Sequence, residues 1–334
     1  MAIRVERDGM NAKRRTFLAA GAALAALPVT GRAGHYPERY VRLIVPGGAG
    51  GATDAVARIP QPEAQRALGE PLVLENRTGA AGAIGTVEAV RSAPDGYTLL
   101  VASLGTHVLR PLMIKERYDT LRDLSPITRL VDVPAVILAA PDLPVVTLDD
   151  VIALAKAAPV PLAYGTPGVG STAHLTAELL SIRTGIALLH VPYSTSAAAY
   201  KDVIAGRLAL VFSVATGVQG HVEAGQMKAI AVTSRKRLAS LPNVPTVEES
   251  GIADFDVTSW YGIMAPAGTP IDVRIVVQQA FVAALRNDEV AGNLAGIGAQ
   301  IVGNTPEQFA ADLRDDFRRW SAVISAAKLD TPRN

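Results

Sequence analysis

Short apolar segments alternate along this chain with alanine-rich segments of helical period, and this alternation constrains the fold more than any other feature. Strands that are apolar on both faces need cover on both sides, and helices between successive strands supply that cover. The sequence therefore predicts an α/β protein of parallel strands joined by helices. The predicted strands span residues 41–45, 72–74, 98–102, 135–139, 162–164, 187–191, 209–212, 228–232 and 262–265, and the clearest helices span 86–91, 148–157, 172–184, 197–205, 271–286 and 306–327.

Length and composition limit the kinds of protein that this chain can be. It has 334 residues, 49% of them hydrophobic, and at roughly 150 residues per domain it is long enough for about two domains. Its 32 Lys and Arg residues nearly balance its 31 Asp and Glu residues, which argues against a nucleic-acid partner. The absence of cysteine excludes disulfides, thiolate metal sites and cysteine nucleophiles. The five histidines lack the spacing of a helical zinc site, so we expect neither a metal nor a cofactor.

Residues 1–33 have the composition of an export signal. A basic stretch contains Arg14 and Arg15, the apolar run 17–29 follows it, and small residues end the segment at Ala33. The apolar run is shorter than the roughly 20 residues that span a bilayer. The sequence therefore predicts a periplasmic protein that is cleaved near Ala33 and exported through the twin-arginine route. The alternative, a Sec signal with adjacent arginines, leads across the same membrane.

Two glycine-rich loops follow predicted strands at the points where helices begin. One spans residues 47–54 and reads Gly-Gly-Ala-Gly-Gly-Ala-Thr-Asp, and the other spans 165–172 and reads Gly-Thr-Pro-Gly-Val-Gly-Ser-Thr. The carboxyl ends of parallel strands meet at one edge of a sheet, where ligands bind. Glycines let consecutive backbone N–H groups converge, and a helix N-terminus adds its positive dipole, so both loops predict an anion site. Alternatively, the side chains at the ends of the loops cap the helices and use the same donors.

Two prolines interrupt the helix that is expected after the first of these loops. Pro60 and Pro62 lie six and eight residues after Asp54. An interior proline removes a hydrogen bond from the helix and costs about 3 kcal/mol or more. The sequence therefore predicts a short or kinked helix here, and an anion site needs only its first turn.

Motifs for nucleotide binding and for serine hydrolases are incomplete. Neither glycine loop contains the lysine of a P-loop. Residues 168–173 match a dinucleotide-binding pattern, but no acidic residue follows at the required distance. The nucleophile elbow is absent around Ser103 and Ser171. An exported hydrolase or transferase that uses one of these serines with His107 or His174 is the alternative function, although each histidine equally fits a hydrogen-bonded partner of its loop.

Many short sequence blocks follow one another over nearly the whole chain after residue 33. They include Val41-Arg42-Leu43-Ile44-Val45-Pro46, Gly50-Gly51-Ala52-Thr53-Asp54, Pro94-Asp95-Gly96-Tyr97-Thr98, Gly105-Thr106-His107, His190-Val191-Pro192-Tyr193, Pro242-Asn243-Val244-Pro245-Thr246 and Ala265-Pro266-Ala267-Gly268-Thr269-Pro270. In this order, the blocks resemble those of the extracytoplasmic solute-binding receptors of tripartite tricarboxylate transporters, the Bug receptors. A series of this length is far more specific than any one block.

The resemblance implies a type II periplasmic-binding-protein fold, with two α/β lobes, a hinge and a ligand cleft between the lobes. Residues 36–134 and 252–334 would form lobe 1, and residues 135–251 would form lobe 2. The implied function is that of a receptor rather than an enzyme. It would act as a monomer, capture a small organic carboxylate and deliver it to the membrane permease subunits of the transporter. A ligand sensor that partners a membrane kinase is a further alternative.

The resemblance also implies which residues bind the ligand. In the family, loop backbone groups, hydroxyls and ordered water hold the ligand carboxylate, without an arginine clamp. Mapped by motif, the expected ligand-binding residues are Gly47, Gly48, Ala49, Gly50, Gly51, Thr53, Asp54, Ser103, Thr106 and His107 in lobe 1, and Thr166, Gly170, Ser171, Thr172, His174, Tyr193 and Ser213 in lobe 2.

Three positions depart from the family's pattern. Gly47 replaces an aromatic residue, which implies a wider pocket or the loss of an apolar wall. Ser194 replaces the basic residue that usually follows Tyr193. Ser213 replaces a common acidic residue, and without that counter-charge an amino acid ligand is disfavoured. Without residues 1–33, which hold six basic and two acidic residues, the formal charge falls from +1 to −3, so local backbone dipoles have to attract an anion.

Overall fold

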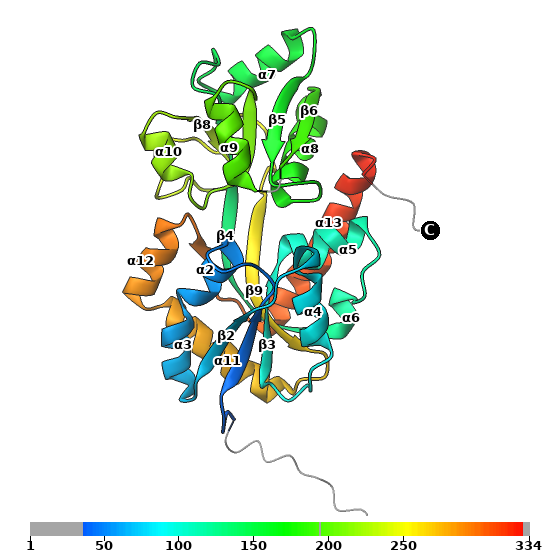
Figure 1. Cartoon of the computed structure of the whole chain (residues 1–334), viewed down its shortest axis with the longest axis vertical. Coiled ribbons are helices and arrows are strands. Elements are labelled where there is room, and N and C mark those ends of the chain that lie inside the picture. The colour runs from blue at the N-terminus through cyan, green and yellow to red at the C-terminus, as the bar shows by residue number, and fades with distance from the viewer. Residues whose placement is uncertain (1–35, 194, 330–334) are drawn as a thin grey trace, which may run out of the picture. The chain divides into compact units, whose positions relative to one another are not determined.

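Two long antiparallel strands, β4 (Leu124–Ala139) and β9 (Thr258–Pro266), run through the middle of the fold and connect its two α/β lobes (Figure 1). The computed structural model describes residues 36–193 and 195–329. The predicted export signal and Ser194 lie outside the described residues.

The first lobe is built on three parallel strands. Strand β1 (Val41–Val45) lies between β2 (Leu72–Asn76) and β3 (Thr98–Ser103), and β3 pairs with the antiparallel β9. The short strand β10 (Gln300–Ile301) pairs with β4. The helical segments of this lobe are α2 (Ala52–Arg58), α3 (Gln61–Leu68), the turn η1 (Ala80–Gly82), α4 (Ala83–Val90), the π-helical turn η2 (Gly105–Leu109), α5 (Arg110–Met113), α6 (Thr120–Asp123), α11 (Ile271–Leu285) and α12 (Asp288–Gly296).

The second lobe repeats the parallel arrangement on a smaller scale. Strand β5 (Leu162–Thr166) lies between the parallel strands β6 (Leu188–Pro192) and β7 (Leu210–Val214). Strands β7 and β8 (Lys228–Val232) both pair with β4, in antiparallel orientation. The helices of this lobe are α7 (Leu148–Ala157), α8 (Thr172–Thr184), α9 (Ser196–Ile204) and α10 (Gln219–Glu223).

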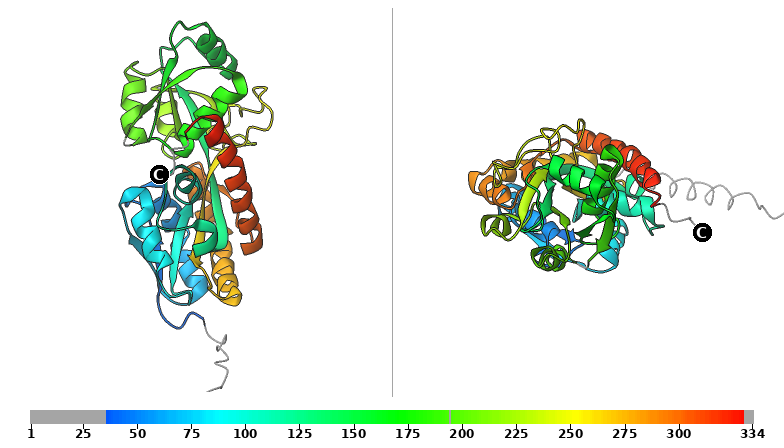
Figure 2. Two further views of the ribbon diagram at one scale, coloured as in Figure 1. Left: turned by 90° about the vertical axis from the view of Figure 1, so that its right-hand side faces the viewer. Right: turned by 90° about the horizontal axis from the view of Figure 1, so that it is seen from above.

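Strand β4 changes partners part-way along its length. Its residues up to Pro134 pair with β9, and its residues from Ala135 onward pair with β7 and β8. The C-terminal helix α13 (Pro306–Ala326) contacts β4, α5 and α8 (Figure 2). A capping box at Thr305 starts this helix, and the indole of Trp260 on β9 donates to Asp316 on its buried side at 2.8 Å.

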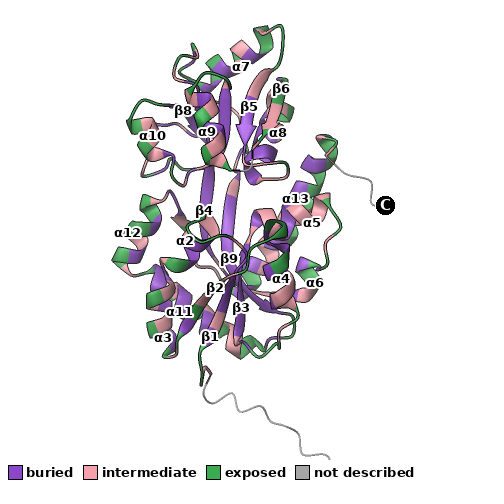
Figure 3. Cartoon of the chain, in the orientation of Figure 1, coloured by how far each residue is buried: buried purple, intermediate pink, exposed green. Residues whose placement is uncertain are grey.

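Both faces of the central strands are buried, which explains their mostly apolar sequences. Leu43 and Val101 contribute to the core on one face, and their neighbours Ile44 and Leu100 contribute to a second core on the other. Figure 3 shows β4 and β9 coloured as buried along most of their length. Among the described helices, none combines the length and apolarity needed to cross a membrane.

The structure confirms the predicted α/β class and corrects one part of the prediction. The expected purely parallel order is wrong for β4 and β9, which run antiparallel to their neighbours because they pass between the lobes in opposite directions. The first part of β4 was not predicted, since Pro126, Arg129, Asp132 and Pro134 interrupt its apolar pattern.

The prolines after the first glycine loop end the helix as predicted. Helix α2 stops at Arg58, and α3 restarts with Pro60 at its N-cap and Pro62 in its first turn, where a missing N–H costs nothing.

Candidate functional site

Three loops at the carboxyl ends of strands carry most of the predicted site residues. They are the β1 loop (residues 46–51), the β3 loop (residues 103–107) and the β5 loop (residues 166–171). The first two lie side by side, because β1 and β3 are parallel neighbours in the first lobe. The third is in the second lobe.

A buried carboxylate holds the β1 loop. Asp54 is 3% exposed, and it accepts hydrogen bonds from the Gly50 N–H at 2.9 Å and from the Arg58 guanidinium at 2.7 Å. Asn76 donates both to Asp54 and to the Gly47 carbonyl, each at 3.0 Å. The hydrogen bond from Arg58 is the largest of the effects that lower the pKa of Asp54 to about 2. The carboxylate is therefore ionised, and the protein's own donors occupy it.

A buried neutral imidazole holds the β3 loop. The Nδ1 atom of the fully buried His107 accepts from the Ser103 N–H at 3.1 Å and lies 3.3 Å from the Ser103 carbonyl oxygen, and Nε2 lies 3.2 Å from Thr86 Oγ1. The Thr86 hydroxyl in turn donates to the Gly82 carbonyl at 2.9 Å. Burial lowers the pKa of His107 to about 4, so the ring is neutral near pH 7. This chain of hydrogen bonds joins the β3 loop to the start of α4.

Residues 79–82 form a fourth segment of the site that the sequence did not predict. All four have positive φ angles, between 46° and 119°, and two of them are alanines, for which this left-handed conformation is unfavourable. Thr106 Oγ1 donates to the Ala81 carbonyl at 3.4 Å. A Cβ atom on Gly82 would lie 3.0 Å from the Pro46 carbonyl and from the Thr106 methyl group, so this segment touches both the β1 and the β3 loops.

Hydroxyls and a second imidazole hold the β5 loop. Ser171 is the N-cap of α8: its Oγ accepts from the His174 N–H at 3.2 Å and donates to the Gly168 carbonyl at 2.8 Å. The Nδ1 atom of His174 accepts from the Gly170 N–H at 3.2 Å, as His107 does from the residue four positions before it. The capping interpretation of the sequence is therefore confirmed for Ser171.

A stack of aromatic rings lies against the β5 loop. The ring of His174 stacks on His190 with centroids 4.0 Å apart, and His190 stacks on Tyr164 at 5.0 Å. Thr166 Oγ1 lies 2.7 Å from His190 Nε2, and the Tyr164 hydroxyl donates to Glu178 at 2.8 Å. Burial lowers the pKa of both histidines to about 4. The β5 loop thus rests on uncharged rings near pH 7.

The remaining second-lobe residues of the prediction lie around this loop. The Tyr193 hydroxyl donates to Asp202, and this hydrogen bond raises the pKa of Tyr193. Ser213 is fully buried and accepts from the Tyr200 hydroxyl at 2.7 Å. The Thr172 hydroxyl is buried too and lies 3.4 Å from that of Ser259 on β9.

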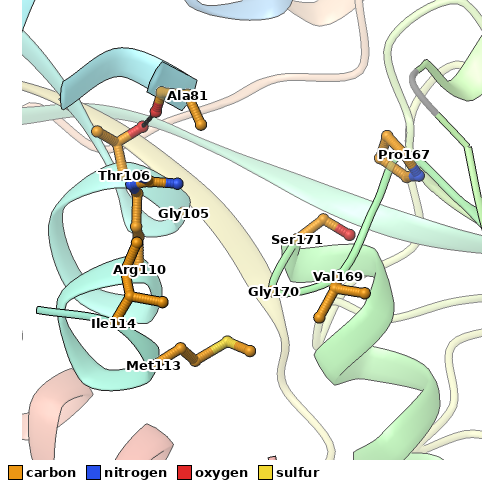
Figure 4. Close-up of a pocket in the computed structure, with 10 residues that line it drawn as sticks. All are labelled: Ala81, Gly105, Thr106, Arg110, Met113, Ile114, Pro167, Val169, Gly170 and Ser171. Carbon is orange, nitrogen blue, oxygen red and sulfur yellow. Dashed lines mark hydrogen bonds between the residues drawn. The ribbon is translucent and has the colours of Figure 1, made fainter. Parts of the chain in front are cut away.

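A cavity of about 450 Å³ lies between the β3 loop and the β5 loop, as Figure 4 shows. Thr106, Gly170 and Ser171 are the predicted site residues that line it, whereas the β1 loop, Tyr193 and Ser213 do not. The lining residues are Ala81, Gly105, Thr106, Arg110, Met113, Ile114, Pro167, Val169, Gly170 and Ser171.

Sequence reasoning missed the wall that α5 and its flanks contribute. Arg110, Met113 and Ile114 line the cavity, and Met113 also contacts the other lobe, since a Cβ atom on Gly170 would lie 2.8 Å from its sulfur. The only signal in the sequence is position: Arg110 follows the Gly105-Thr106-His107 block within one helical turn.

The serines and histidines do not form catalytic pairs. His107 and His174 accept backbone N–H groups through Nδ1, and in residues 36–193 and 195–329 no hydrogen bond joins either ring to the Ser103 or Ser171 hydroxyl. A general base has to reach the hydroxyl that it activates. The described part of the chain also contains no group of three or more metal-binding side chains that could hold a metal ion.

Comparison with known families agrees with this geometry. Residues 56–329 match the tripartite tricarboxylate transporter family receptor. The chain belongs to this receptor family. Protein BugT of Bordetella pertussis is 37% identical to the receptor over 308 residues, which cover 91% of this chain and 94% of BugT.

Solved structures of similar sequence share the receptor's fold. The periplasmic binding protein BugD is 33% identical, with a TM-score of 0.75 over 88% of this chain and 99% of its own. An R. palustris protein solved with adipate is 32% identical, with a TM-score of 0.78 over 88% and 98% of the two chains. MatC from Rhodopseudomonas palustris, solved with bound malate, is 29% identical, with a TM-score of 0.75 over 86% and 100%.

These findings confirm the predicted family and its two-lobed fold. The family is one of solute-binding receptors and not of enzymes, so the hydrolase or transferase alternative is not favoured.

Proposed function

We propose that this receptor works in the periplasm, where it captures a small organic carboxylate between its lobes and delivers it to the permease subunits of a tripartite transporter. The observation that carries the proposal is the cavity, because Gly105 and Thr106 contribute one wall and Pro167, Val169, Gly170 and Ser171 contribute the other. Its volume of about 450 Å³ suits a small ligand. The relatives solved with adipate and malate support a carboxylate.

The loops provide hydrogen-bond donors to an anion, and they do so without a buried positive charge. The first N–H groups of α8 have no acceptor within the helix, and the helix dipole makes this end positive. The hydroxyls of Thr106 and Ser171 line the same cavity. Closure of the lobes excludes water, which strengthens each hydrogen bond to the ligand.

We assign two roles to the expected site residues. Thr106, Gly170 and Ser171 contact the ligand, whereas Asp54, His107 and His174 hold the loops in place. The β1 loop joins the site through its contact with residues 79–82. The other surrounding residues are Gly47, Gly48, Ala49, Gly50, Gly51, Thr53, Ser103, Thr166, Thr172, Tyr193 and Ser213.

The hinge belongs where β4 changes partners, between Pro134 and Ala135. Residues 36–134 and 252–334 then form one rigid lobe, and residues 135–251 form the other.

The receptor acts as a monomer, and its N-terminal signal is removed near Ala33 after export through the twin-arginine route. N-terminal sequencing of the periplasmic form tests the export, and a mature chain that still began before Thr16 would contradict it.

Isothermal titration tests the binding function. The receptor is unfolded, stripped of bound ligand and refolded, and then titrated with a panel of mono-, di- and tricarboxylates. We expect at least one carboxylate to bind with a heat of binding that saturates at one ligand per chain. If no member of the panel binds to correctly folded protein, the proposed function is wrong. Turnover of a chromogenic ester that disappears in Ser103→Ala or Ser171→Ala would favour the hydrolase instead.

A further inference from the structure

Arg110 stands apart from the other residues that line the ligand cavity. Of the ten described residues that line it, nine carry no charge, and Arg110 is the tenth. It lies at the start of α5, directly after the π-helical turn that contains His107. Its side chain is 28% exposed, so it is neither buried in the core nor fully in solvent.

One edge of the Arg110 guanidinium is occupied, and the other is open. Its Nε donates to Glu116, whose side chain is only 7% exposed. Within residues 36–193 and 195–329, no side chain or backbone acceptor bonds the two terminal nitrogens. The terminal edge of a guanidinium presents two parallel N–H donors, which match the two oxygens of a carboxylate.

The cavity has polar groups on two opposite sides and apolar side chains beside them. Figure 4 shows Arg110 and Ile114 on one side of the cavity and Ser171 and Val169 on the opposite side, with Met113 extending from the first side toward the second. This arrangement fits a ligand with two charged ends and a hydrocarbon middle, because an apolar wall favours carbon and disfavours a charged group.

The surroundings of Arg110 favour a second negative charge. Arg110 also lines an adjoining groove of about 700 Å³. Both carboxylates of this groove are already paired, Glu116 with Arg110 and Glu88 with Arg42. The other cations of the groove are Arg91, Lys115 and Arg117, and they make the local electrostatic potential positive, which attracts anions. The charged residues of the groove are Glu88, Arg91, Arg110, Lys115, Glu116 and Arg117.

We infer that the ligand is a dicarboxylate whose first carboxylate binds at the β5 loop and whose second carboxylate pairs with the open edge of Arg110. The hydrocarbon chain of the ligand lies along Met113, Ile114 and Val169. The inference rests on the proposed function and narrows its ligand class. Arg110 is then the residue that distinguishes dicarboxylates from monocarboxylates of the same length.

The experiment compares acids that differ only in the second carboxylate. Adipate is paired with hexanoate, succinate with butyrate, and suberate with octanoate, and each is titrated into the stripped receptor. Arg110→Gln removes the cation but leaves the buried Glu116 without its partner, which destabilises this segment. The double variant Arg110→Gln with Glu116→Gln removes both charges and is the variant that decides. Arg117→Gln is the matched control, since Arg117 lines the groove but not the cavity.

We expect the wild type to bind its preferred diacid at least about tenfold more tightly than the matched monoacid. In the double variant this preference disappears while monoacid affinity changes by less than about threefold, and Arg117→Gln keeps the preference. Equal affinity for both members of every pair, or a preference that survives in the double variant, overturns the inference and leaves the proposed function standing. Failure of the wild type to bind any carboxylate overturns the proposed function and the inference together.

Discussion

The β1 loop and the β5 loop occupy equivalent places in the two lobes, and different chemistry holds each of them. Both are rich in glycine and join a parallel strand to a helix. An ionised carboxylate, Asp54, organises the β1 loop, whereas the hydroxyl of Ser171 and the neutral ring of His174 organise the β5 loop. Glycine content therefore indicates where a loop forms but not what fixes it.

The difference follows from which loop faces the cavity. The β5 loop lines it, and a carboxylate fixed there would repel an anionic ligand at close range. The β1 loop does not line it, and its carboxylate is almost fully buried against Arg58 and Asn76. Uncharged groups thus hold the loop at the cavity, and a charged group holds the loop beside it.

Mildly acidic pH should destabilise the loops that histidine rings hold, but not the loop that Asp54 holds. This change has the largest expected effect. The pKa of His107 and His174 is about 4 in the folded protein and 6.5 when the ring is unperturbed, so between these values the unfolded chain binds more protons. The stability that these rings contribute is complete above pH 6.5 and is lost as the pH falls toward 4. By pH 5 we expect a loss of about 2 kcal/mol for each ring. Urea unfolding at pH 7, 6 and 5, in the wild type and in the variants below, measures the share of each ring, because His190, whose pKa is also about 4, adds to the total loss and Asp316, whose pKa is raised to about 6, opposes it.

Two substitutions serve as controls for this pH effect. Asn can present an acceptor where Nδ1 of histidine lies but does not titrate, so His107→Asn and His174→Asn should each reduce the pH dependence between pH 7 and 5. The pKa of Asp54 is about 2 against an ordinary 3.8, so its contribution is lost only as the pH falls through that lower range. Variants with an unchanged pH dependence would show that other groups cause the acid sensitivity.

The sequence predicted the parallel parts of the fold well because they have a simple physical signature. Strands such as β3 and β7 are buried on both faces and read as mostly apolar runs. The first half of β4 was missed, since it carries Arg129 and Asp132, which pair with each other beside β9. A strand that passes between two lobes has polar positions that an apolar pattern cannot reveal.

The sequence predicted the loops of the site but not the side chains of α5 that line the cavity. Gly170, Ser171 and Thr106 belong to motifs that can be recognised locally. Arg110 and Met113 lie on α5, directly after the π-helical turn, and line the cavity from there. The donors that occupy Asp54 include Asn76, a residue on another strand. Such contacts form in the tertiary structure, and the spacing of residues along the sequence does not predict them.

The carboxylate of the β1 loop gives the next largest effect. Asp54→Asn removes the charge that Gly50, Arg58 and Asn76 share, so we expect the free energy of unfolding to fall by about 2 kcal/mol at pH 7. The matched control is Arg58→Gln, whose side chain is 56% exposed, and it should cost less than about 1 kcal/mol. Urea unfolding measures both. Equal losses would mean that the ion pair, and not the bonds to Gly50 and Asn76, holds the loop.

Loss of the helix cap of the β5 loop has the smallest expected effect on stability. Its substitution also tests whether the capping residue affects ligand binding as well as stability. Ser171→Ala removes the bond to the His174 N–H, and Thr195→Ala removes the equivalent cap of α9, which accepts from the Ala198 N–H at 3.2 Å. Each should lower the free energy of unfolding by about 1 kcal/mol. Ser171 also lines the cavity and ties the loop to the Gly168 carbonyl, so Ser171→Ala should weaken carboxylate binding by about tenfold, whereas Thr195→Ala leaves it unchanged. Calorimetric titration of both variants with one carboxylate measures the contrast. If both bind as the wild type does, the hydroxyl supports the helix alone, and the ligand then relies on the backbone donors of the loop.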